Sequence, residues 1–157
     1  MIDANVLVAG TICPRFFYEV LQHALRQDFI LMLTPTIIRE ARQTIQKKFP
    51  QYSPALSIFL ETGCYEIVPD PLDEEIALNF DLIRDPKDIP IALSAIRAAV
   101  DYLVTNDTDF TAQHSTTKSF QQKVTPLTAG RFLKEVMDWT SEELEAIRQR
   151  NWRDIGI

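Results

Sequence analysis

The sequence predicts an α/β fold in which short buried strands alternate with amphipathic helices. Apolar runs of strand length recur between segments with helical periodicity, which is the pattern of α/β domains. The 157 residues are 46% apolar, enough to build one sizeable core. No internal repeat, low-complexity tract or long linker divides the sequence. We therefore expect one domain over residues 1–157.

The first elements follow from small, β-branched and capping residues. Residues 2–9 are mostly small or β-branched, which favours a short strand or the end of one. Pro14 suits the first turn of a helix that we place at residues 14–27. A buried strand is expected at residues 29–33. Thr34 followed by Pro35 is the signature of an N-cap and first helical position, so the next helix extends to about residue 48.

The middle of the chain repeats this alternation. We expect a helix over residues 55–61 that ends at Gly63, an edge strand over residues 65–68, and a helix over residues 73–83. Pro86 then begins a helix that continues to about residue 99. Residues 102–105 form a strand, because they are apolar and bounded by Asp101 and Asn106.

The last part combines a polar segment with two terminal helices. Residues 114–122 are polar, and we expect a loop there that contains His114. A strand at residues 124–127 and a helix at residues 129–136 follow. Thr140 and Glu143 have the spacing of a capping box that begins the final helix. The sequence leaves open whether the terminal segment with Trp152 packs on the domain or binds a partner.

Charge and composition exclude several classes of protein. The sequence contains no apolar run of membrane-spanning length and no secretory signal, and Cys13 and Cys64 lack metal or redox spacing. We expect a cytoplasmic protein whose thiols are buried or free. The net charge of −6 makes a broad basic binding face improbable in this fold.

Five carboxylates are expected at the same edge of the sheet, because the carboxyl ends of parallel strands lie together. They come from four predicted elements: Asp3, Glu40, Asp88, Asp107 and Asp109. Clustered carboxylates repel one another, and hard divalent cations relieve that repulsion. If cations offset these five charges, 17 acidic residues remain against 16 basic ones, so a polyanionic substrate is not excluded.

Each acid also has an ordinary structural interpretation. Asp3 and Asp85 suit caps, and Glu40 suits a solvated helix face. Asp88 suits the first turn of a helix, and Asp107 with Asp109 suits a turn after a strand.

Other chemistries lack the residues that they need. With two histidines and four glycines, the chain has no material for a His-rich zinc site, a Ser-His-Asp triad or a phosphate-binding glycine loop. A phosphatase with an aspartyl nucleophile would need a second aspartate, and the triplet that begins at Asp3 is Asp-Ala-Asn. Metal-assisted chemistry on a phosphodiester is what remains, with one or two cations.

Four segments together resemble the motifs of PIN-domain ribonucleases. They are MIDANVLVAG, TIIREARQ around Glu40, RDPKDIPIALSA and DYLVTNDTDF. The resemblance covers residues 1–127 and leaves residues 128–157 as terminal helices. It implies a three-layer α/β/α sandwich with a central, mostly parallel sheet, and Mg²⁺- or Mn²⁺-dependent hydrolysis of single-stranded RNA. The family includes toxins of prokaryotic toxin–antitoxin pairs.

The resemblance assigns catalytic and metal-binding roles to four acids, Asp3, Glu40, Asp88 and Asp107. Asp109 competes with Asp107 as a metal ligand, since family members differ in which one is used. Asn5 and Thr105 resemble polar residues that orient ligands or water, and Asp85 resembles a recurrent residue of its loop. Only two residues precede Asp3, so either the first strand is short or the chain begins further upstream.

Basic side chains offer contacts to RNA phosphates, although solvated helix faces explain them equally well. The candidates are Arg15, Arg39, Arg42, Lys47, Lys48, Arg84 and Lys87. The resemblance also implies an antitoxin partner and a homodimer as possibilities. A catalytically silent module that binds RNA or protein is the alternative function. The RNA target lies beyond what the sequence indicates.

Overall fold

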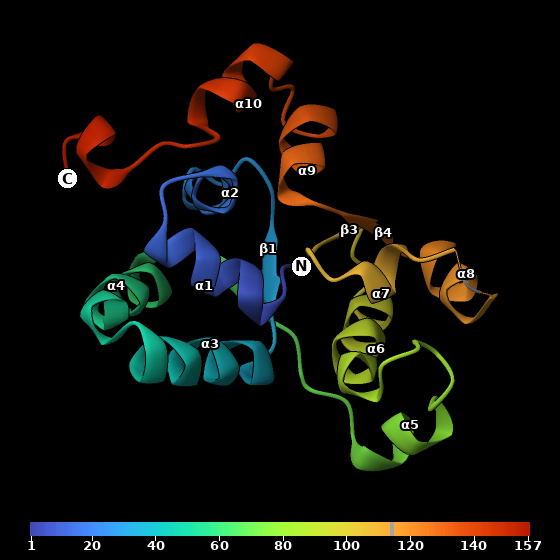
Figure 1. Cartoon of the computed structure of the whole chain (residues 1–157). Helices are drawn as coiled ribbons and strands as arrows, with labels where there is room; N and C mark the ends of the chain where they lie inside the picture. Colours follow the sequence, from blue (N-terminus) through green and yellow to red (C-terminus); the bar gives the residue numbers. More distant parts are fainter. Residues whose placement is uncertain (114) are drawn as a thin grey trace.

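The computed structural model describes all residues of the chain except His114 (Figure 1). For residues 115 and 116 it describes the backbone and not the side chains. Its helices are α1 Ala4–Ile12, α2 Phe16–Leu25, α3 Pro35–Lys48, α4 Ser53–Thr62, α5 Asp73–Leu78, α6 Ile89–Arg97, α7 Thr108–Thr111, α8 Ser115–Gln121, α9 Ala129–Glu135 and α10 Ser141–Ile147. The strands are β1 Leu31–Leu33, β2 Tyr65–Ile67, β3 Tyr102–Val104 and β4 Thr125–Leu127. Short 3-10 turns cover Pro50–Tyr52, Pro86–Asp88 and Trp152–Ile155. The predicted α/β fold is confirmed.

All paired strands in the described part of the chain are parallel. Strand β1 pairs with β2, with Leu31 opposite Tyr65, and β3 pairs with β4, with Tyr102 opposite Thr125. Ile2 adds an isolated parallel bridge to Val104, so the start of the chain lies beside β3. The strands thus form two separate two-stranded sheets, and one central sheet in a three-layer sandwich stays a prediction.

The predicted strand over residues 2–9 is wrong beyond Asp3. The backbone of Met1 to Asp3 does run along β3, with Val104 N donating to Met1 O at 2.9 Å and Asp3 N to Val104 O at 3.4 Å. The chain then turns into α1, because Asp3 Oδ1 caps it by accepting a hydrogen bond from Val6 N at 2.8 Å. The helix buries Val6, Leu7 and Val8 in succession, so no amphipathic periodicity marks it in the sequence.

Three further segments differ from expectation. The segment predicted as a polar loop contains α8, whose Phe120 is fully buried with its ring 5.5 Å from that of Phe110. The expectation for His114 itself lies outside the described residues. Helix α5 ends at Leu78, earlier than predicted, and Pro86 begins a 3-10 turn before α6.

The remaining predicted elements are present within a few residues. Helix α3 begins after Thr34, whose hydroxyl accepts a hydrogen bond from Ile37 N at 3.1 Å, and ends at Lys48 as expected. The capping box of Thr140 and Glu143 begins α10. Cys13 is half-buried and Cys64 exposed, and both thiols are free. Among the described helices, none combines the length and apolarity that crossing a bilayer requires.

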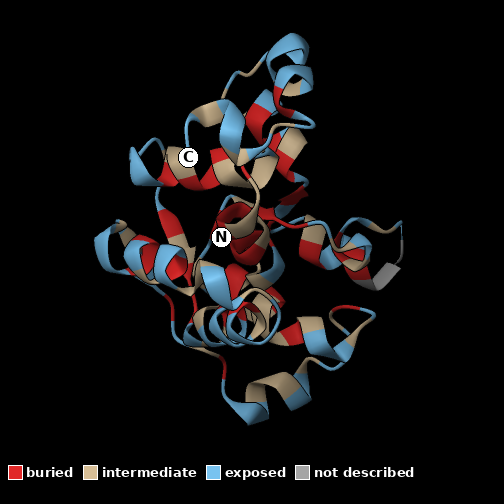
Figure 2. Cartoon of the chain, turned by 60° about the vertical axis from the view of Figure 1, so that its left-hand side comes forward, coloured by how far each residue is buried: buried red, intermediate tan, exposed pale blue. Residues whose placement is uncertain are grey.

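The core lies between the inward faces of the helices and both small sheets. Buried residues surround the N-terminal segment in Figure 2, while exposed residues cover the outward faces. Leu7, Leu33 and Leu103, from α1, β1 and β3, have no exposed surface. The strand ends that carry the candidate acids are therefore fixed by a continuous apolar core.

The C-terminal segment packs on the domain, which answers a question that the sequence left open. Trp152 Nε1 donates to Ile12 O at 3.1 Å, and its ring meets that of Tyr18 edge-on at 5.4 Å. Arg150 forms an ion pair with the buried Glu19 and donates to Pro14 O at 2.6 Å. We refer to residues 150–157 as the C-terminal strap.

Gly10 allows α1 and α2 to approach closely. A Cβ atom at this position would lie 2.6 Å from Leu21 Cδ1 and 2.8 Å from the backbone oxygen of Phe17. The backbone oxygen cannot move aside without shifting α2. At Gly130 in α9, by contrast, a Cβ would meet only Phe16, at an ordinary 3.7 Å.

We expect Gly10→Ala to lower the free energy of unfolding by about 1–3 kcal/mol, the usual effect of overpacking. Gly130→Ala is the matched control, and it should be neutral or stabilise by up to about 1 kcal/mol, since alanine favours a helix. Urea unfolding of both variants measures the difference. Equal stabilisation by both would contradict the close approach of α1 and α2.

Candidate metal centre

One polar cavity of about 140 Å³ gathers four of the predicted acids. Asp3, Glu40, Asp88 and Asp107 all line it. They come from the cap of α1, the middle of α3, the 3-10 turn before α6 and the loop between β3 and α7. Residues more than a hundred positions apart in the sequence thus meet in one small space.

Asp3 is held from two sides. Its Oδ1 caps α1, and its Oδ2 accepts a hydrogen bond from the hydroxyl of Thr105, which is fully buried. The pKa of Asp3 is raised from its ordinary value, mainly because burial disfavours the charged form. The hydrogen bonds from Thr105 and Val6 oppose that shift. The carboxylate therefore has a fixed orientation and a need for positive charge.

Thr105 also links Asp3 to the next acid. Its Oγ1 accepts a hydrogen bond from Asp107 N at 3.0 Å, immediately after β3. Asp107 in turn caps α7, since its Oδ1 accepts from Asp109 N at 2.9 Å. One threonine at the strand end thereby positions both sides of the cavity.

Asp88 has the least satisfied carboxylate of the site. Its Oδ2 is buried and has no hydrogen-bond partner among the described residues. Burial, followed by the charge of Asp107 and a hydrogen bond with it, raises the pKa of Asp88 to about 7. Asp85 and Asp109 add further repulsion. An ionised Asp88 without a cation is therefore costly to the folded state.

A second group of carboxylates adjoins the cavity. One oxygen from each of Asp85, Asp88 and Asp109 lies within 4.8 Å of the others. Asp85 caps the 3-10 turn by accepting from Lys87 N at 3.0 Å, as its ordinary interpretation predicted. Asp109 lies in the first turn of α7 and is not among the residues that line the cavity. We call Asp85, Asp88 and Asp109 the outer carboxylates.

The structure also brings an acid to the cavity that the sequence reasoning missed. Asp70 lines it and accepts a hydrogen bond from Thr36 N at 3.4 Å, at the start of α3. It follows strand β2 by three residues, so the strand-end rule that selected Asp107 applies to Asp70 as well. Glu40 and Asn5 also line the cavity, and both are exposed to solvent.

The basic candidates are distributed unevenly. Lys87 lines the cavity, and Arg39 lies on α3 with its guanidinium donating to the Thr36 hydroxyl at 3.2 Å. Arg84 contacts Asp109 at 2.6 Å. Arg15 lies elsewhere, because its Nε donates to Arg150 O of the C-terminal strap at 3.3 Å. Of the seven basic candidates, Lys87 alone lines the cavity, so it is placed best for a substrate phosphate.

The donor set fits a hard divalent cation. Five carboxylates line the cavity, and no histidine or cysteine lines it within the described part of the chain. Mg²⁺ and Mn²⁺ prefer such oxygen ligands. The unpartnered Asp88 oxygen and the raised pKa values of Asp3 and Asp88 both indicate missing positive charge.

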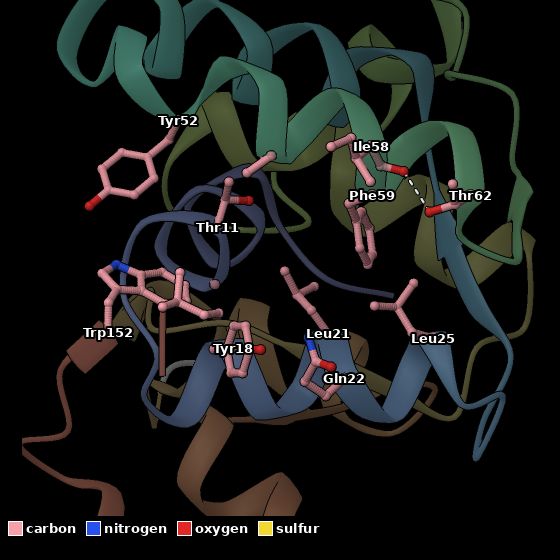
Figure 3. Close-up of a pocket in the computed structure, with 13 residues that line it drawn as sticks. Thr11, Tyr18, Leu21, Gln22, Leu25, Tyr52, Ile58, Phe59, Thr62 and Trp152 are labelled. Carbon is pink, nitrogen blue, oxygen red and sulfur yellow. Dashed lines mark hydrogen bonds between the residues drawn. The ribbon is translucent and has the colours of Figure 1, made fainter. Parts of the chain in front are cut away.

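A larger, apolar cavity offers no comparable chemistry. It occupies about 550 Å³ between α1, α2, α4 and the C-terminal strap. Figure 3 shows Leu21 and Phe59 facing each other across it, with Trp152 at one end. Its described lining contains no charged side chain, so we place the functional site at the smaller acidic cavity.

The pKa of Asp88 predicts how stability depends on pH. Because the pKa is raised from 3.8 to about 7 on folding, Asp88 stabilises the fold at low pH, and that contribution is lost as pH rises towards 7. Asp88→Asn should therefore be more stable than the wild type at pH 8 in EDTA, by on the order of 1–2 kcal/mol after allowance for partial exposure. The difference should shrink at pH 4. Urea unfolding at both pH values measures it, and an equal difference at both would refute the assignment.

Comparison with known proteins gives one match. A family model described as a PIN domain matches residues 1–109, more than two thirds of the chain. No curated protein and no solved structure matches significantly. The matched region includes the acids of the cavity and the outer carboxylates.

Proposed function

The chain belongs to the PIN-domain family, whose members are generally nucleases, and from this premise we propose that it is a metal-dependent endoribonuclease acting on single-stranded RNA. One observation carries the proposal. Asp3, Glu40, Asp88 and Asp107 reach a single small cavity from four elements of the fold. If each acid served only as a cap, a turn residue or part of a solvated helix face, the four would have no reason to meet in one cavity.

Four carboxylates are proposed to hold the cation, Mg²⁺ or Mn²⁺: Asp3, Glu40, Asp88 and Asp107. When bound, such a cation supplies an acidified water and offsets the charge of the phosphodiester. The hydroxyl of Thr105 donates a hydrogen bond to Asp3 and accepts one from Asp107 N, so it fixes the positions of both acids relative to each other. Asn5 and Lys87, at the cavity wall, are proposed to bind water and a phosphate oxygen.

A cleavage assay tests the proposal. A fluorescent single-stranded RNA is incubated with the protein in Mg²⁺, in Mn²⁺ and in EDTA, with DNA of the same sequence as comparison. We expect cleavage of RNA that requires the cation and is lost in Asp88→Asn and Asp107→Asn. The control is Glu61→Gln, which changes an exposed carboxylate on α4 away from the cavity. Binding of RNA without any cleavage would favour the silent module instead.

We further propose that the protein is the toxin of a toxin–antitoxin pair and that a partner protein controls it. For the fold, we propose that its strands belong to a three-layer sandwich. The motif resemblance supports these points. A small DNA-binding protein encoded by the neighbouring reading frame, which co-purifies with this chain and blocks cleavage, is the expected finding. Sedimentation of the isolated chain tests the proposed homodimer.

A further inference from the structure

Asp88 belongs to two groups of acids at once. On one side it lines the cavity with Asp3, Glu40 and Asp107. On the other side it is one of the outer carboxylates, with Asp85 and Asp109. Each group has enough oxygen atoms for a cation, so the geometry of the acids alone leaves the number of bound ions open.

Arg84 distinguishes the two groups. Its Nη2 lies 2.6 Å from Asp109 Oδ1, an oxygen with no hydrogen bond of good geometry among the described residues. The Asp109 side chain is only 14% exposed, so water offers it little alternative solvation. A guanidinium stays protonated at every accessible pH. The outer carboxylates therefore already have a permanent positive charge in contact with them.

That charge excludes a second positive ion from the same oxygen. A carboxylate oxygen holds Mg²⁺ at about 2.1 Å, which would bring the ion to within roughly 5 Å of the guanidinium nitrogen. At such a distance two cations repel each other appreciably, even in a medium of intermediate dielectric. Lys87 is exposed and borders the cavity, and the structure shows no ion pair between it and the outer carboxylates among the described residues.

We propose that Arg84 is a positioning residue that takes the place of a second cation at the outer carboxylates. The protein then binds one divalent ion, in the cavity, with Asp107 rather than Asp109 as its ligand. This inference depends on the proposed metal-dependent function. The Arg84 side chain is 69% exposed, so the ion pair itself adds little to stability, and the number of bound ions is the informative quantity.

Counting Mn²⁺ ions by electron paramagnetic resonance and titration calorimetry on the full chain tests the proposal. The wild type should bind one Mn²⁺, and Arg84→Gln should bind a second at least tenfold more tightly than any further ion on the wild type. Arg84→Lys keeps the positive charge and should bind one Mn²⁺. The double variant Arg84→Gln/Asp85→Asn should also bind one Mn²⁺, because it lacks one of the outer carboxylates. A structural role of Arg84 would not change the number of ions in this way.

The control is Arg131→Gln, because Arg131 forms an exposed ion pair with Glu135 at 3.0 Å within α9, whose residues do not line the cavity. It should leave the count at one. Two ions on the wild type, or one on Arg84→Gln, would overturn the role of Arg84 while leaving metal dependence intact. No bound ion on any variant would overturn the proposed metal dependence itself, and this inference with it.

Discussion

Asp3→Asn is expected to reduce RNA cleavage by roughly 100-fold or more while leaving the fold intact. Even groups that only support a metal ligand contribute 10–100-fold to metal affinity or activity, so a direct ligand should contribute at least as much. Asparagine caps helices about as well as aspartate, so the hydrogen bond to Val6 N can survive the change. Cleavage assays and urea unfolding on the same protein separate the two roles.

Asp3→Ala provides the comparison for that experiment. It removes the charge and the cap of α1 together, so it should lose cleavage and about 1 kcal/mol of stability as well. If Asp3→Asn kept more than half of the wild-type rate, Asp3 would be a cap alone. The metal centre would then depend on Glu40, Asp88 and Asp107.

Phe110→Ala should destabilise the protein by about 3–5 kcal/mol, the range for truncating a buried aromatic side chain. Phe110 is 1% exposed, packs against Phe120 and also borders the acidic cavity. Because α7 carries both Phe110 and Asp109, loss of this ring removes the support of the acids that follow β3. Urea unfolding measures the loss.

Phe110→Leu is the matched variant, since it keeps most of the apolar volume and should cost less than half as much. The comparison separates the effect of a cavity from that of the aromatic ring. A cost below about 1 kcal/mol for Phe110→Ala would mean that α7 does not depend on this contact.

The sequence predicted elements well where a local signal was strong. Thr34 with Pro35 located the start of α3, and Thr140 with Glu143 located that of α10. The prediction failed at α1, because a helix buried on several sides lacks the periodicity that distinguishes it from a strand. It failed at α8 because Phe120 is buried by tertiary contact with Phe110, which a polar segment does not reveal.

The candidate site was predictable to the extent that it follows strand ends. Asp107 came from that rule, whereas Asp70 was overlooked, although it follows β2 in the same way. The separation of Asp107 from Asp109 was not predictable, since both follow the same strand. In the folded structure Asp107 lines the cavity, whereas Asp109 lies outside it and contacts Arg84.

The pairing of Met1 to Asp3 with β3 bears on when the acidic cavity can form during synthesis of the chain. Asp3 is made before the strand beside it and the threonine that orients it, which both lie about a hundred residues downstream. Asp107 is made after Asp3, Glu40 and Asp88, and β4 is made later still. A nascent chain therefore carries most of the acids without the means to arrange them. An RNA-cleaving protein with this order of elements would spare the message on which it is being made.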